Sequence, residues 1–261
     1  MISQIDFHIN ALDAMKVYPK ELFFLGKSEL LQKRKISIVG SRKANKYAKE
    51  LTHQLARKIA HAGGVVVSGG AIGIDAVAHR AAGGASTIMV AATGLDKRYP
   101  AINKNLIAEI EERGLVLSQF QAGIPSRKYN FVLRNELVVA LGEVLVVAYA
   151  DKNSGTMRSV EYAKKMGKKI YVLPHRIGES VATNELLANK EAEAIYDIDA
   201  FLDALGFKNA KSVANEADDF LIYCRTNPSY DEAVAKFPKR LFEAELLGEV
   251  EVVDGRVRVL T

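Results

Sequence analysis

The segment from Val65 to His79 constrains the fold more than any other part of the chain. Three consecutive valines are typical of a buried parallel strand, a Ser-Gly-Gly-Ala turn follows, and residues 74–82 have the pattern of a helix with Asp75 in its first turn. A strand that ends in a glycine loop and opens a helix directs several backbone N–H groups and the positive end of the helix dipole at one point. The sequence therefore predicts an anion site here, most naturally a phosphate site.

The spacing of the glycines in this segment disfavours a dinucleotide cofactor. Counted from Gly69, the dinucleotide fingerprint needs glycines where Ala71 and Ile74 stand. No Ser-His-Asp set, carboxylate pair or metal-ligand spacing stands out elsewhere, so we expect no catalytic residue, no metal and no cofactor. Asp75 and His79 lie four residues apart on one predicted helix face, which favours a structural hydrogen bond between them.

Composition excludes several classes of protein. Of the 261 residues, 49% are hydrophobic and 26% are charged, which is ordinary for a globular protein with a sizeable core. The single cysteine, Cys224, excludes an intramolecular disulfide and a cysteine-based zinc cluster. No apolar run approaches the ~20 residues of a membrane span, and the first residues lack the pattern of a signal peptide. We therefore expect a cytoplasmic protein without a membrane association.

The charge of the chain is unevenly distributed. Residues 215–261 carry 6 Lys/Arg against 10 Asp/Glu, and residues 1–214 carry 30 against 21, so a net charge of −4 follows one of +9. A basic body attracts a polyanion, whereas an acidic tail repels one, although chance variation of a solvated surface produces similar differences.

From residue 35 onward, apolar strand-like segments alternate with helical ones. Strands are predicted at 36–39, 65–68, 87–91, 115–118, 144–148, 169–173 and near 194–196. Helices are predicted at 46–61, 74–82, 103–113, 131–141, 156–166, 183–189 and 197–207. This alternation is typical of a parallel sheet covered on both faces. We expect an extended Rossmann-like, mostly parallel, doubly wound α/β sheet, whose ligands bind beyond the carboxyl ends of the strands.

The remaining segments suggest four parts. Residues 1–34 are expected to form a short lead-in whose segment 22–25 packs on the main body, residues 35–207 the Rossmann-like domain, and residues 208–214 a linker. Residues 215–261 predict helices at 217–224, 230–236 and 238–247, followed by strands 249–253 and 256–260 joined by Asp254-Gly255, a strong hairpin signal. We expect a small winged-helix-like domain whose acidity favours a role in protein interaction or packing.

Side chains that can bind a phosphate or stack on a ring recur where the predicted strands end. Ser41 and Arg42 follow the first strand, and arginine can hold two phosphate oxygens with a bidentate fork. Lys97 follows the third strand, Lys128 and Phe131 follow the fourth, and Ser154-Gly155 opens a helix as a second anion site. A single-stranded nucleic acid requires cations along its phosphates and rings that stack on its bases. An isolated aromatic residue would more often pack in the core.

Taken together, these segments closely resemble the DNA-processing protein A (DprA or Smf) family of bacterial natural transformation. The likeness rests on the ordered motifs Ile38–Arg42, Ser68–Asp75 with Ala78-His79, Gly94-Leu95-Asp96 with Tyr99-Pro100 and Asn103, Arg134-Asn135, and Ser154-Gly155. The resemblance implies a domain that binds single-stranded DNA, forms a homodimer and helps to load the RecA recombinase, with no catalytic activity and no cofactor. It also implies that Phe131 holds a base and that Arg42 and Lys128 hold phosphates. The predicted DNA-binding residues are Ser41, Arg42, Ser68, Gly69, Gly70, Ala71, Gly73, Lys97, Lys128, Phe131, Arg134, Asn135, Ser154 and Gly155.

The expected function is thus a non-enzymatic protein that binds and protects incoming single-stranded DNA and loads RecA. One departure from the family pattern is Glu136, because many members have a second arginine at that position. The alternative is a nucleotide-processing enzyme of the nucleoside monophosphate phosphoribohydrolase type, which uses similar Gly-Gly and Gly-Thr loops. In this chain the first glutamate after Gly155-Thr156 is Glu161, which is displaced by two residues from the position that such an enzyme needs.

Overall fold

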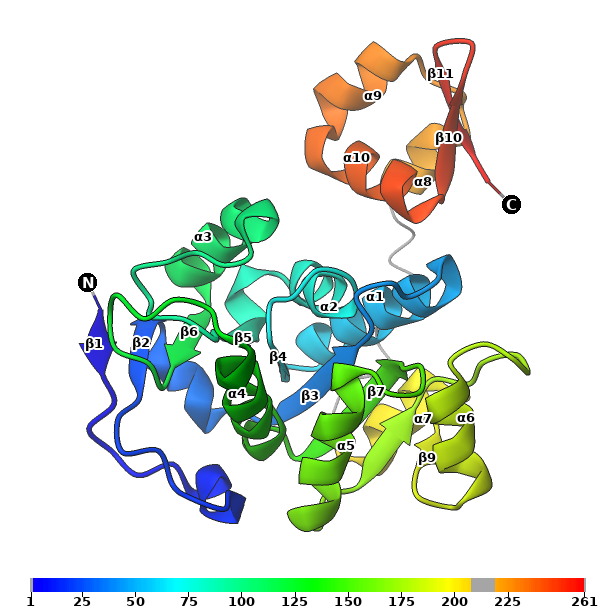
Figure 1. Ribbon diagram of the computed structural model, residues 1–261. Helices are drawn as coiled ribbons and strands as arrows, with labels where there is room; N and C mark the ends of the chain where they lie inside the picture. Colours follow the sequence, from blue (N-terminus) through cyan, green and yellow to red (C-terminus); the bar gives the residue numbers. More distant parts are fainter. Residues whose placement is uncertain (1, 208–218, 261) are drawn as a thin grey trace. The chain divides into compact units, whose positions relative to one another are not determined.

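The computed structural model describes residues 2–207 and 219–260, which belong to two compact units, Met1–Ala210 and Lys211–Thr261 (Figure 1). Each unit has its own buried apolar core. The linker predicted at 208–214 lies outside the described residues. Within the described ranges, none of the helices combines the length and the apolarity that crossing a bilayer requires.

The first unit is built on one nine-stranded sheet with the strand order β1-β2-β6-β5-β4-β3-β7-β8-β9. All neighbours from β6 to β9 pair in parallel, whereas β2 pairs antiparallel with β6 and β1 antiparallel with β2. The predicted mostly parallel α/β sheet is therefore confirmed. The strands are β1 (Ser3–Gln4), β2 (Phe23–Gly26), β3 (Lys35–Gly40), β4 (Val65–Ser68), β5 (Thr87–Val90), β6 (Leu115–Ser118), β7 (Val144–Tyr149), β8 (Ile170–Val172) and β9 (Glu193–Ala194).

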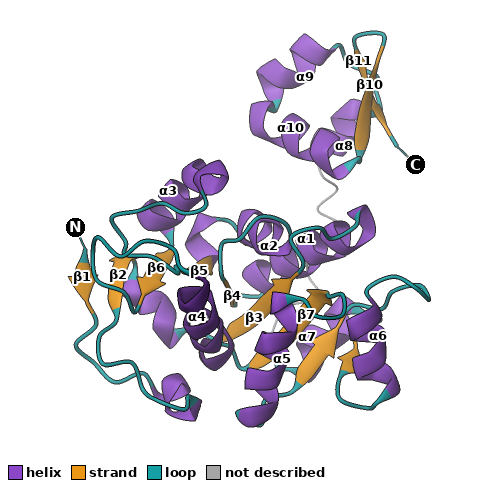
Figure 2. Ribbon diagram, viewed as in Figure 1, coloured by secondary structure: helices purple, strands orange, loops and turns teal. Residues whose placement is uncertain are grey.

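Helices cover both faces of this sheet (Figure 2). Val65 and Val67 of β4 contribute to the core that includes α4, α5 and α6, while Val66 between them contributes to the core of α1, α2 and α7, as the period of two along a strand requires. The helices are α1 (Lys46–His61), α2 (Ile74–Ala82), α3 (Lys104–Arg113), α4 (Lys128–Leu141), α5 (Gly155–Lys165), α6 (Val181–Ala188) and α7 (Ile198–Ala204). Four short 3₁₀ helices join them: η1 (Asn10–Ala14), η2 (Ser28–Gln32), η3 (Gly84–Ser86) and η4 (Ala101–Asn103).

Helix α1 shows how the local sequence produces its element. Its cap residue Asn45 accepts a hydrogen bond from the backbone N–H of Ala48 at 2.8 Å, which satisfies one of the free donors of the first turn. Ala48, Leu55 and Ile59 recur at helical spacing and are fully buried against the sheet. Burial of each large side chain stabilises the fold by about 1.5–3 kcal/mol.

The chain reverses its winding direction at β3. It proceeds from β3 through β4 and β5 to β6 on one side, then returns to the other side of β3 with β7, β8 and β9. The crevice beyond the carboxyl ends of β3 and β7 is the switch point, where doubly wound sheets bind ligands.

The structure changes two of the predicted elements near this crevice. Residues 22–25 do not merely pack on the main body, because β2 is a strand of the same sheet whose partner β6 lies about ninety residues later in the chain. Helix α4 begins at Lys128 rather than at 131, which places this lysine in the first helical turn. A short apolar run cannot reveal a partner so distant in sequence, and helix ends are set by local caps.

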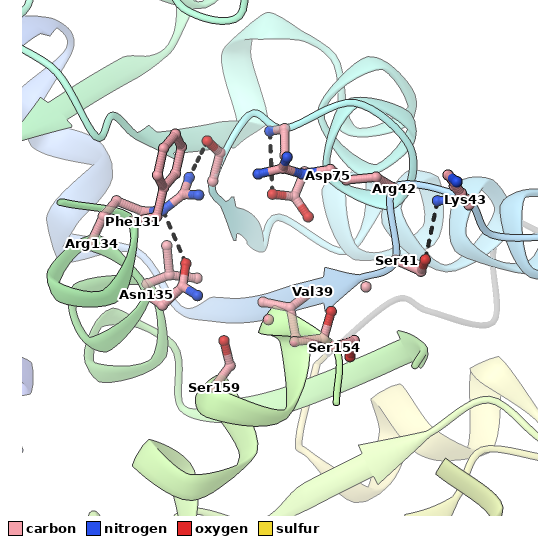
Figure 3. A pocket seen from close by; sticks show the side chains of 16 residues that line it. Val39, Ser41, Arg42, Lys43, Asp75, Phe131, Arg134, Asn135, Ser154 and Ser159 are labelled. Carbon is pink, nitrogen blue, oxygen red and sulfur yellow. Dashed lines mark hydrogen bonds between the residues drawn. The ribbon is translucent and has the colours of Figure 1, made fainter. Parts of the chain in front are cut away.

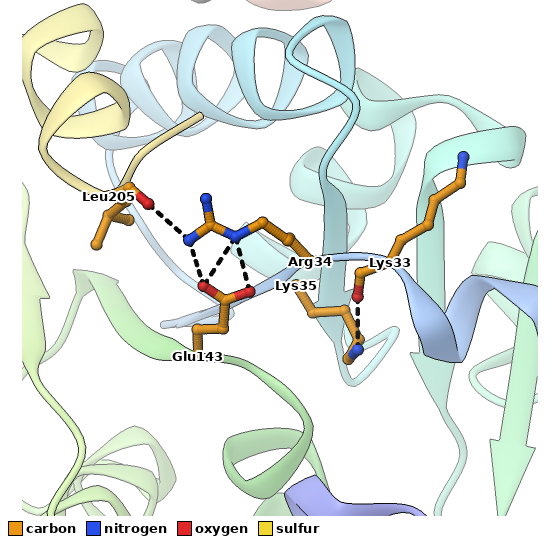
Figure 4. Close-up of polar contacts among 5 residues, drawn as sticks. All are labelled: Lys33, Arg34, Lys35, Glu143 and Leu205. Atoms are coloured by element: carbon orange, nitrogen blue, oxygen red, sulfur yellow. Dashed lines mark hydrogen bonds and ion pairs between the residues drawn. The ribbon is translucent and has the colours of Figure 1, made fainter. Parts of the chain in front are cut away.

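A cluster of charged residues closes the opposite, amino edge of the sheet (Figure 4). The Arg34 guanidinium donates to both carboxylate oxygens of Glu143 at 2.5–3.2 Å and to the carbonyl of Leu205 at 2.6 Å. The Lys35 ammonium donates to the carbonyls of Leu31 and Lys33 at 2.7 and 2.6 Å. Each of these cations is therefore used to hold the fold together.

The second unit has the predicted order of three helices and a hairpin. Ser229 and Glu232 form a capping box that starts the second helix. The positive φ angles of Asp254 and Gly255, 51° and 73°, are those of a type I′ turn, which joins the two strands tightly. The elements are α8 (Asp219–Cys224), α9 (Tyr230–Lys236), α10 (Pro238–Leu247), β10 (Val250–Val253) and β11 (Arg256–Val259).

Candidate nucleic-acid interface

A cavity of about 420 Å³ opens at the switch point between β3 and β7 (Figure 3). It brings together segments that are far apart in the sequence: the ends of β3 and β4, residues 131–138 of α4 and the start of α5. Nine of the predicted site residues line it: Ser41, Arg42, Gly69, Ala71, Phe131, Arg134, Asn135, Ser154 and Gly155. The carboxyl ends of parallel strands meet at one edge, which is why loops so distant in sequence converge here.

Arg134 is a buried anchor of the glycine loop. Its side chain donates to the carbonyls of Gly69 and Val90, the latter at 3.0 Å, and to the Asn135 side-chain oxygen at 3.1 Å (Figure 3). A Cβ atom on Gly69 would lie 1.8 Å from an Arg134 nitrogen, so only glycine fits beside this guanidinium. Arg134 therefore positions the loop with three of its five N–H donors, and the two on Nη2 have no hydrogen-bond partner among the described residues.

Asp75 compensates the charge of this buried arginine. Its carboxylate accepts a hydrogen bond from the backbone N–H of Ala71 at 3.3 Å, across the turn that precedes α2. Burial raises the pKa of the Asp75 carboxyl, and the Arg134 guanidinium opposes that rise. Among the described residues that line the cavity, Asp75 is the only carboxylate.

The predicted hydrogen bond between Asp75 and His79 is wrong. His79 Nδ1 instead lies 2.6 Å from the hydroxyl of Thr87 on β5, and this hydroxyl donates to the Val66 carbonyl at 3.1 Å. His79 Nδ1 is consequently the donor, since the proton of the hydroxyl is already used. Burial, together with the nearby Arg134 and Arg80, lowers the pKa of His79 to about 3, so the ring is neutral near pH 7.

An aromatic ring with two arginines around it forms one wall of the cavity. The guanidinium carbons of Arg42 and Arg134 each lie 5.8 Å from the centre of the Phe131 ring, within the range of cation–π attraction. The Tyr99 ring lies 5.9 Å from the same ring, and a smaller hollow of about 100 Å³ separates these groups. The sequence motifs do not assign Tyr99 to the site, because no local pattern pairs it with Phe131, a residue far along the chain.

The opposite wall is suited to an anion. Gly155 and Thr156 form the first turn of α5, where backbone N–H groups and the helix dipole favour negative charge. The buried hydroxyl of Ser154 has no hydrogen-bond partner among the described residues. Across the cavity, the Ser41 hydroxyl accepts from the backbone N–H of Lys43 at 3.1 Å and so shapes the turn that presents Arg42 (Figure 3).

Three predicted residues of the glycine segment do not line the cavity but hold in place the loop that does: Ser68, Gly70 and Gly73. The Ser68 hydroxyl is fully buried and donates to the Ile38 carbonyl at 2.7 Å, so it is not available at the surface. Gly70 turns away, and its carbonyl accepts from the side chain of Asn103 at 3.0 Å. Gly73 has a φ of 86°, and a Cβ there would lie 2.6 Å from the Ser41 carbonyl oxygen. Gly73 thus allows α2 to begin directly against the end of β3.

Two predicted lysines lie outside the cavity lining. Lys97 donates to the Gly123 carbonyl at 2.6 Å and thereby ties two loops together. Lys128 is exposed in the first turn of α4, one helical turn before Phe131. Of the two, only Lys128 projects a cation that none of the hydrogen bonds between described residues uses.

The cavity also contains residues that the motifs did not indicate. Thr156 and Ser159 line it from α5, and their spacing of three residues places them on one helix face. Glu136, the departure from the family pattern, does not line it: its carboxylate accepts from the backbone N–H of Lys16 at 2.9 Å and anchors the N-terminal segment on α4.

Neither a metal site nor the carboxylate of a hydrolase is evident at this edge. In the described part of the chain no group of three or more His, Cys, Asp and Glu side chains is arranged to hold a metal ion. Glu161 borders a separate surface hollow together with Lys152 and Arg158, and it does not line the cavity.

Comparison with known proteins relates this arrangement to one family. The family model described as DNA recombination-mediator protein A matches residues 4–206. The DNA processing protein DprA of Streptococcus pneumoniae is 36% identical over 169 residues, which are 63% of this chain and 60% of that protein. The DprA of Bacillus subtilis is 30% identical over 197 residues, 74% of this chain and 66% of that protein. The matches cover 60% and 66% of these two relatives and 50% of the putative DNA processing protein DprA of Mycobacterium tuberculosis, so the chain spans less than two thirds of the length of each.

Solved structures give the same result. A structure of DNA processing protein A from Helicobacter pylori, described with a single-stranded DNA binding mode, is 39% identical with a TM-score of 0.77 over 78% of this chain and 95% of that one. The X-ray structure of DprA from Streptococcus pneumoniae is 30% identical with a TM-score of 0.71 over 78% of this chain and 73% of that one.

Proposed function

This chain belongs to the DNA recombination-mediator protein A family, as its motifs predicted, and from that premise we propose that its first unit binds single-stranded DNA along the carboxyl edge of its sheet. The observation that carries the proposal is the pairing, in one cavity, of an anion site with an exposed cation and an aromatic ring. A nucleic-acid strand repeats a phosphate beside a base. The anion site on one wall of the cavity matches the phosphate, and the aromatic ring on the other wall matches the base.

Each side chain has a distinct task in this proposal. Arg42 and Lys128 hold phosphates, while the first turn of α5, with Ser154, receives a further phosphate oxygen. The Phe131 ring stacks on a base, which contributes about 1–3 kcal/mol per base. The net charge of +9 on residues 1–214 attracts the strand before these contacts form.

The wider role that we propose follows the family. The protein protects incoming single-stranded DNA during natural transformation and loads the RecA recombinase onto it, acting as a homodimer and without catalysis of its own. The Helicobacter pylori relative, with its single-stranded DNA binding mode, supports the proposed binding of single-stranded DNA. We further propose that residues 215–261 form a winged-helix-like domain that binds a protein partner, in keeping with their acidity.

Fluorescence anisotropy with labelled oligothymidylates tests DNA binding directly. We expect the wild-type affinity to fall with salt at a log–log slope of about −0.7 per phosphate contacted. Arg42→Ala and Lys128→Ala should weaken binding and flatten that slope, whereas Arg113→Ala, at the carboxyl end of α3 on the other edge of the sheet, should not. Unchanged affinity in both of the first two variants would show that the site is wrongly assigned.

Separate measurements test the wider role. Light scattering after size exclusion reports the oligomeric state, and a strand-exchange assay reports whether the protein accelerates RecA assembly on coated DNA. Release of free base from nucleoside monophosphates would contradict the non-enzymatic part of the proposal and favour the hydrolase alternative.

A further inference from the structure

A second cavity, of about 510 Å³, opens on the same edge of the sheet. It lies between the first turn of α1 and the loop that follows β8. Its polar lining includes Lys46 and Tyr47 from the helix and His175, Arg176 and Glu179 from the loop. None of these residues belongs to the site described above, so their arrangement needs its own explanation.

The two cavities are neighbours along the backbone. Lys43 lines the first and Asn45 lines the second, and two residues span at most about 7.6 Å of extended chain. The strands beneath them are also adjacent, because β3 pairs with β7 and β7 pairs with β8. A strand that leaves the first cavity past Lys43 therefore meets the second one next.

Tyr47 presents an aromatic surface at the mouth of this second cavity. The residue is 44% exposed, so part of the ring faces solvent. The His175 ring contacts it edge-on at 5.7 Å and 80°, and His175 in turn contacts Tyr149 edge-on at 5.2 Å and 76°. The ring is thus supported from below and leaves area for a planar group to stack upon.

His175 also offers a hydrogen-bond acceptor. Its Nε2 lies 2.8 Å from the Ala148 carbonyl, and since a carbonyl can only accept, Nε2 carries the proton. The other ring nitrogen, Nδ1, is then an acceptor in the neutral ring, and it is buried without a partner among the described residues. An amino group on a nucleobase is a donor that would satisfy it.

The charges divide this cavity into two sides. The Glu179 carboxylate accepts from the Asn45 side chain at 3.0 Å, and the Asn45 oxygen caps α1, so this wall is rigid and negative. Glutamate can accept a hydrogen bond from a base amino group, but it repels a phosphate. The cations Lys46 and Arg176 line the same cavity, and Lys46 forms an ion pair with Glu50 at 3.8 Å.

We propose that this second cavity is a subsite for an adjoining nucleotide of the same DNA strand, an inference that rests on the proposed function of the first cavity. The base stacks on Tyr47 and directs the two N–H donors of its exocyclic amino group toward Nδ1 of His175 and the carboxylate of Glu179. The phosphate on the way to it is held by Arg176 and Lys46. The binding track therefore extends from α4 across β3 to the loop after β8.

A length series of oligonucleotides tests the inference. Oligothymidylates and oligocytidylates are shortened one nucleotide at a time until the wild type binds only through its first cavity. We expect Tyr47→Ala to weaken binding of longer strands at least about fivefold, the loss of one stacked base, and to leave the shortest bound strand unaffected. Arg176→Ala should act on the same lengths and lower the salt slope by about 0.7, the share of one phosphate.

Matched controls separate the possible outcomes. Tyr196→Ala removes an exposed ring that lines neither cavity and should change nothing. Equal affinity of wild type, Tyr47→Ala and Arg176→Ala at every length, or an equal loss at every length, would overturn the subsite and leave the proposed function standing. Absence of DNA binding by the wild type would instead refute the proposed function itself. Photocrosslinking of iodouracil-containing strands to the peptide with Tyr47 provides an independent positive result.

Discussion

The two edges of the central sheet contain the same kinds of side chain and use them in opposite ways. At the amino edge, Arg34, Lys35 and Lys168 all donate to carbonyl or carboxylate oxygens of the protein. At the carboxyl edge, the side chains of Arg42 and Lys128 donate to no acceptor within the described residues. The difference lies in the backbone that surrounds each set.

In a sheet of this kind, helices end near the amino edge and begin near the carboxyl edge. The final turn of a helix has unpaired carbonyls, and Lys168 takes up those of Ala140 and Gly142 at the end of α4. The first turn has unpaired N–H groups, which compete with cations for anions and offer them no acceptor. Arg42 and Lys128 consequently remain available for a ligand, whereas Arg134 and Lys97 at the same edge donate to the carbonyls of neighbouring loops.

The largest expected effect concerns Arg134, a cation at the carboxyl edge that, like Lys97, is used within the fold. Arg134→Ala would leave the Asp75 charge and the carbonyls of Gly69 and Val90 buried without their partner. We expect the free energy of unfolding to fall by about 3–5 kcal/mol, the usual cost of leaving a buried charge without its compensating charge. Urea unfolding followed by circular dichroism measures it, with Arg42→Ala as the matched arginine, expected to change stability by less than about 0.5 kcal/mol. Similar values for the two would remove the distinction between them.

The second prediction separates ring from charge at the carboxyl edge. Phe131→Ala should weaken binding of single-stranded DNA by about 1–3 kcal/mol and leave the salt slope unchanged, because the ring releases no counterions. Lys128→Ala should do the reverse, with a modest loss of affinity and a slope reduced by about 0.7. Anisotropy titrations at several salt concentrations distinguish the two patterns, and Phe131→Tyr, which keeps a ring, should bind like the wild type. A change of slope in Phe131→Ala would contradict stacking as its role.

The third prediction uses pH to probe the amino edge. Burial lowers the pKa of Lys168 to about 8, and burial also lowers the pKa of Lys35. The unfolded chain therefore holds more protons than the folded one from about pH 8 to about pH 10.4, the ordinary lysine value, and stability increases as the pH rises through this window. Compared with Lys168→Met, the wild type should gain about 1–2 kcal/mol, a figure reduced because the group is partly exposed to solvent.

Unfolding of both proteins in urea at several pH values measures that difference. Lys169→Met, which alters an exposed neighbour with a distant ion pair at 4.0 Å, should follow the wild type. If the difference in unfolding free energy between wild type and Lys168→Met stayed constant over the whole pH range, burial would not lower the pKa of Lys168.

The smallest expected effect concerns the ion pair of Arg34 and Glu143. Both side chains are about two-fifths exposed, so Glu143→Gln should cost only about 0.5–1 kcal/mol of stability. Binding of single-stranded DNA should be unchanged, because the pair lies on the opposite edge from the cavity. Loss of DNA affinity in this variant would contradict the conclusion that cations of the amino edge stabilise the fold and take no part in binding.

Much of the fold could be predicted from local patterns. The bounds expected for α1, α2, β4 and β6 agree with the structure, because hydrophobic periodicity and glycine stops are properties of short segments. The strand-end motifs also lie together at one edge of the sheet, since topology forces the parallel strands to end on one side. The antiparallel addition of β2 was not foreseeable in this way, because its hydrogen bonds go to β6, a strand far along the chain.

The sequence by itself determined which segments approach the cavity and which residue types they bring. Only the tertiary structure decided what each residue does there. Arg42 and Arg134 lie at equal distances from the Phe131 ring, yet one faces solvent and the other holds the glycine loop. His79 likewise bonds Thr87 rather than Asp75. The physical reason is that the role of a polar group depends on which partners lie within hydrogen-bond distance in the folded chain. Those partners come from residues that periodicity does not connect.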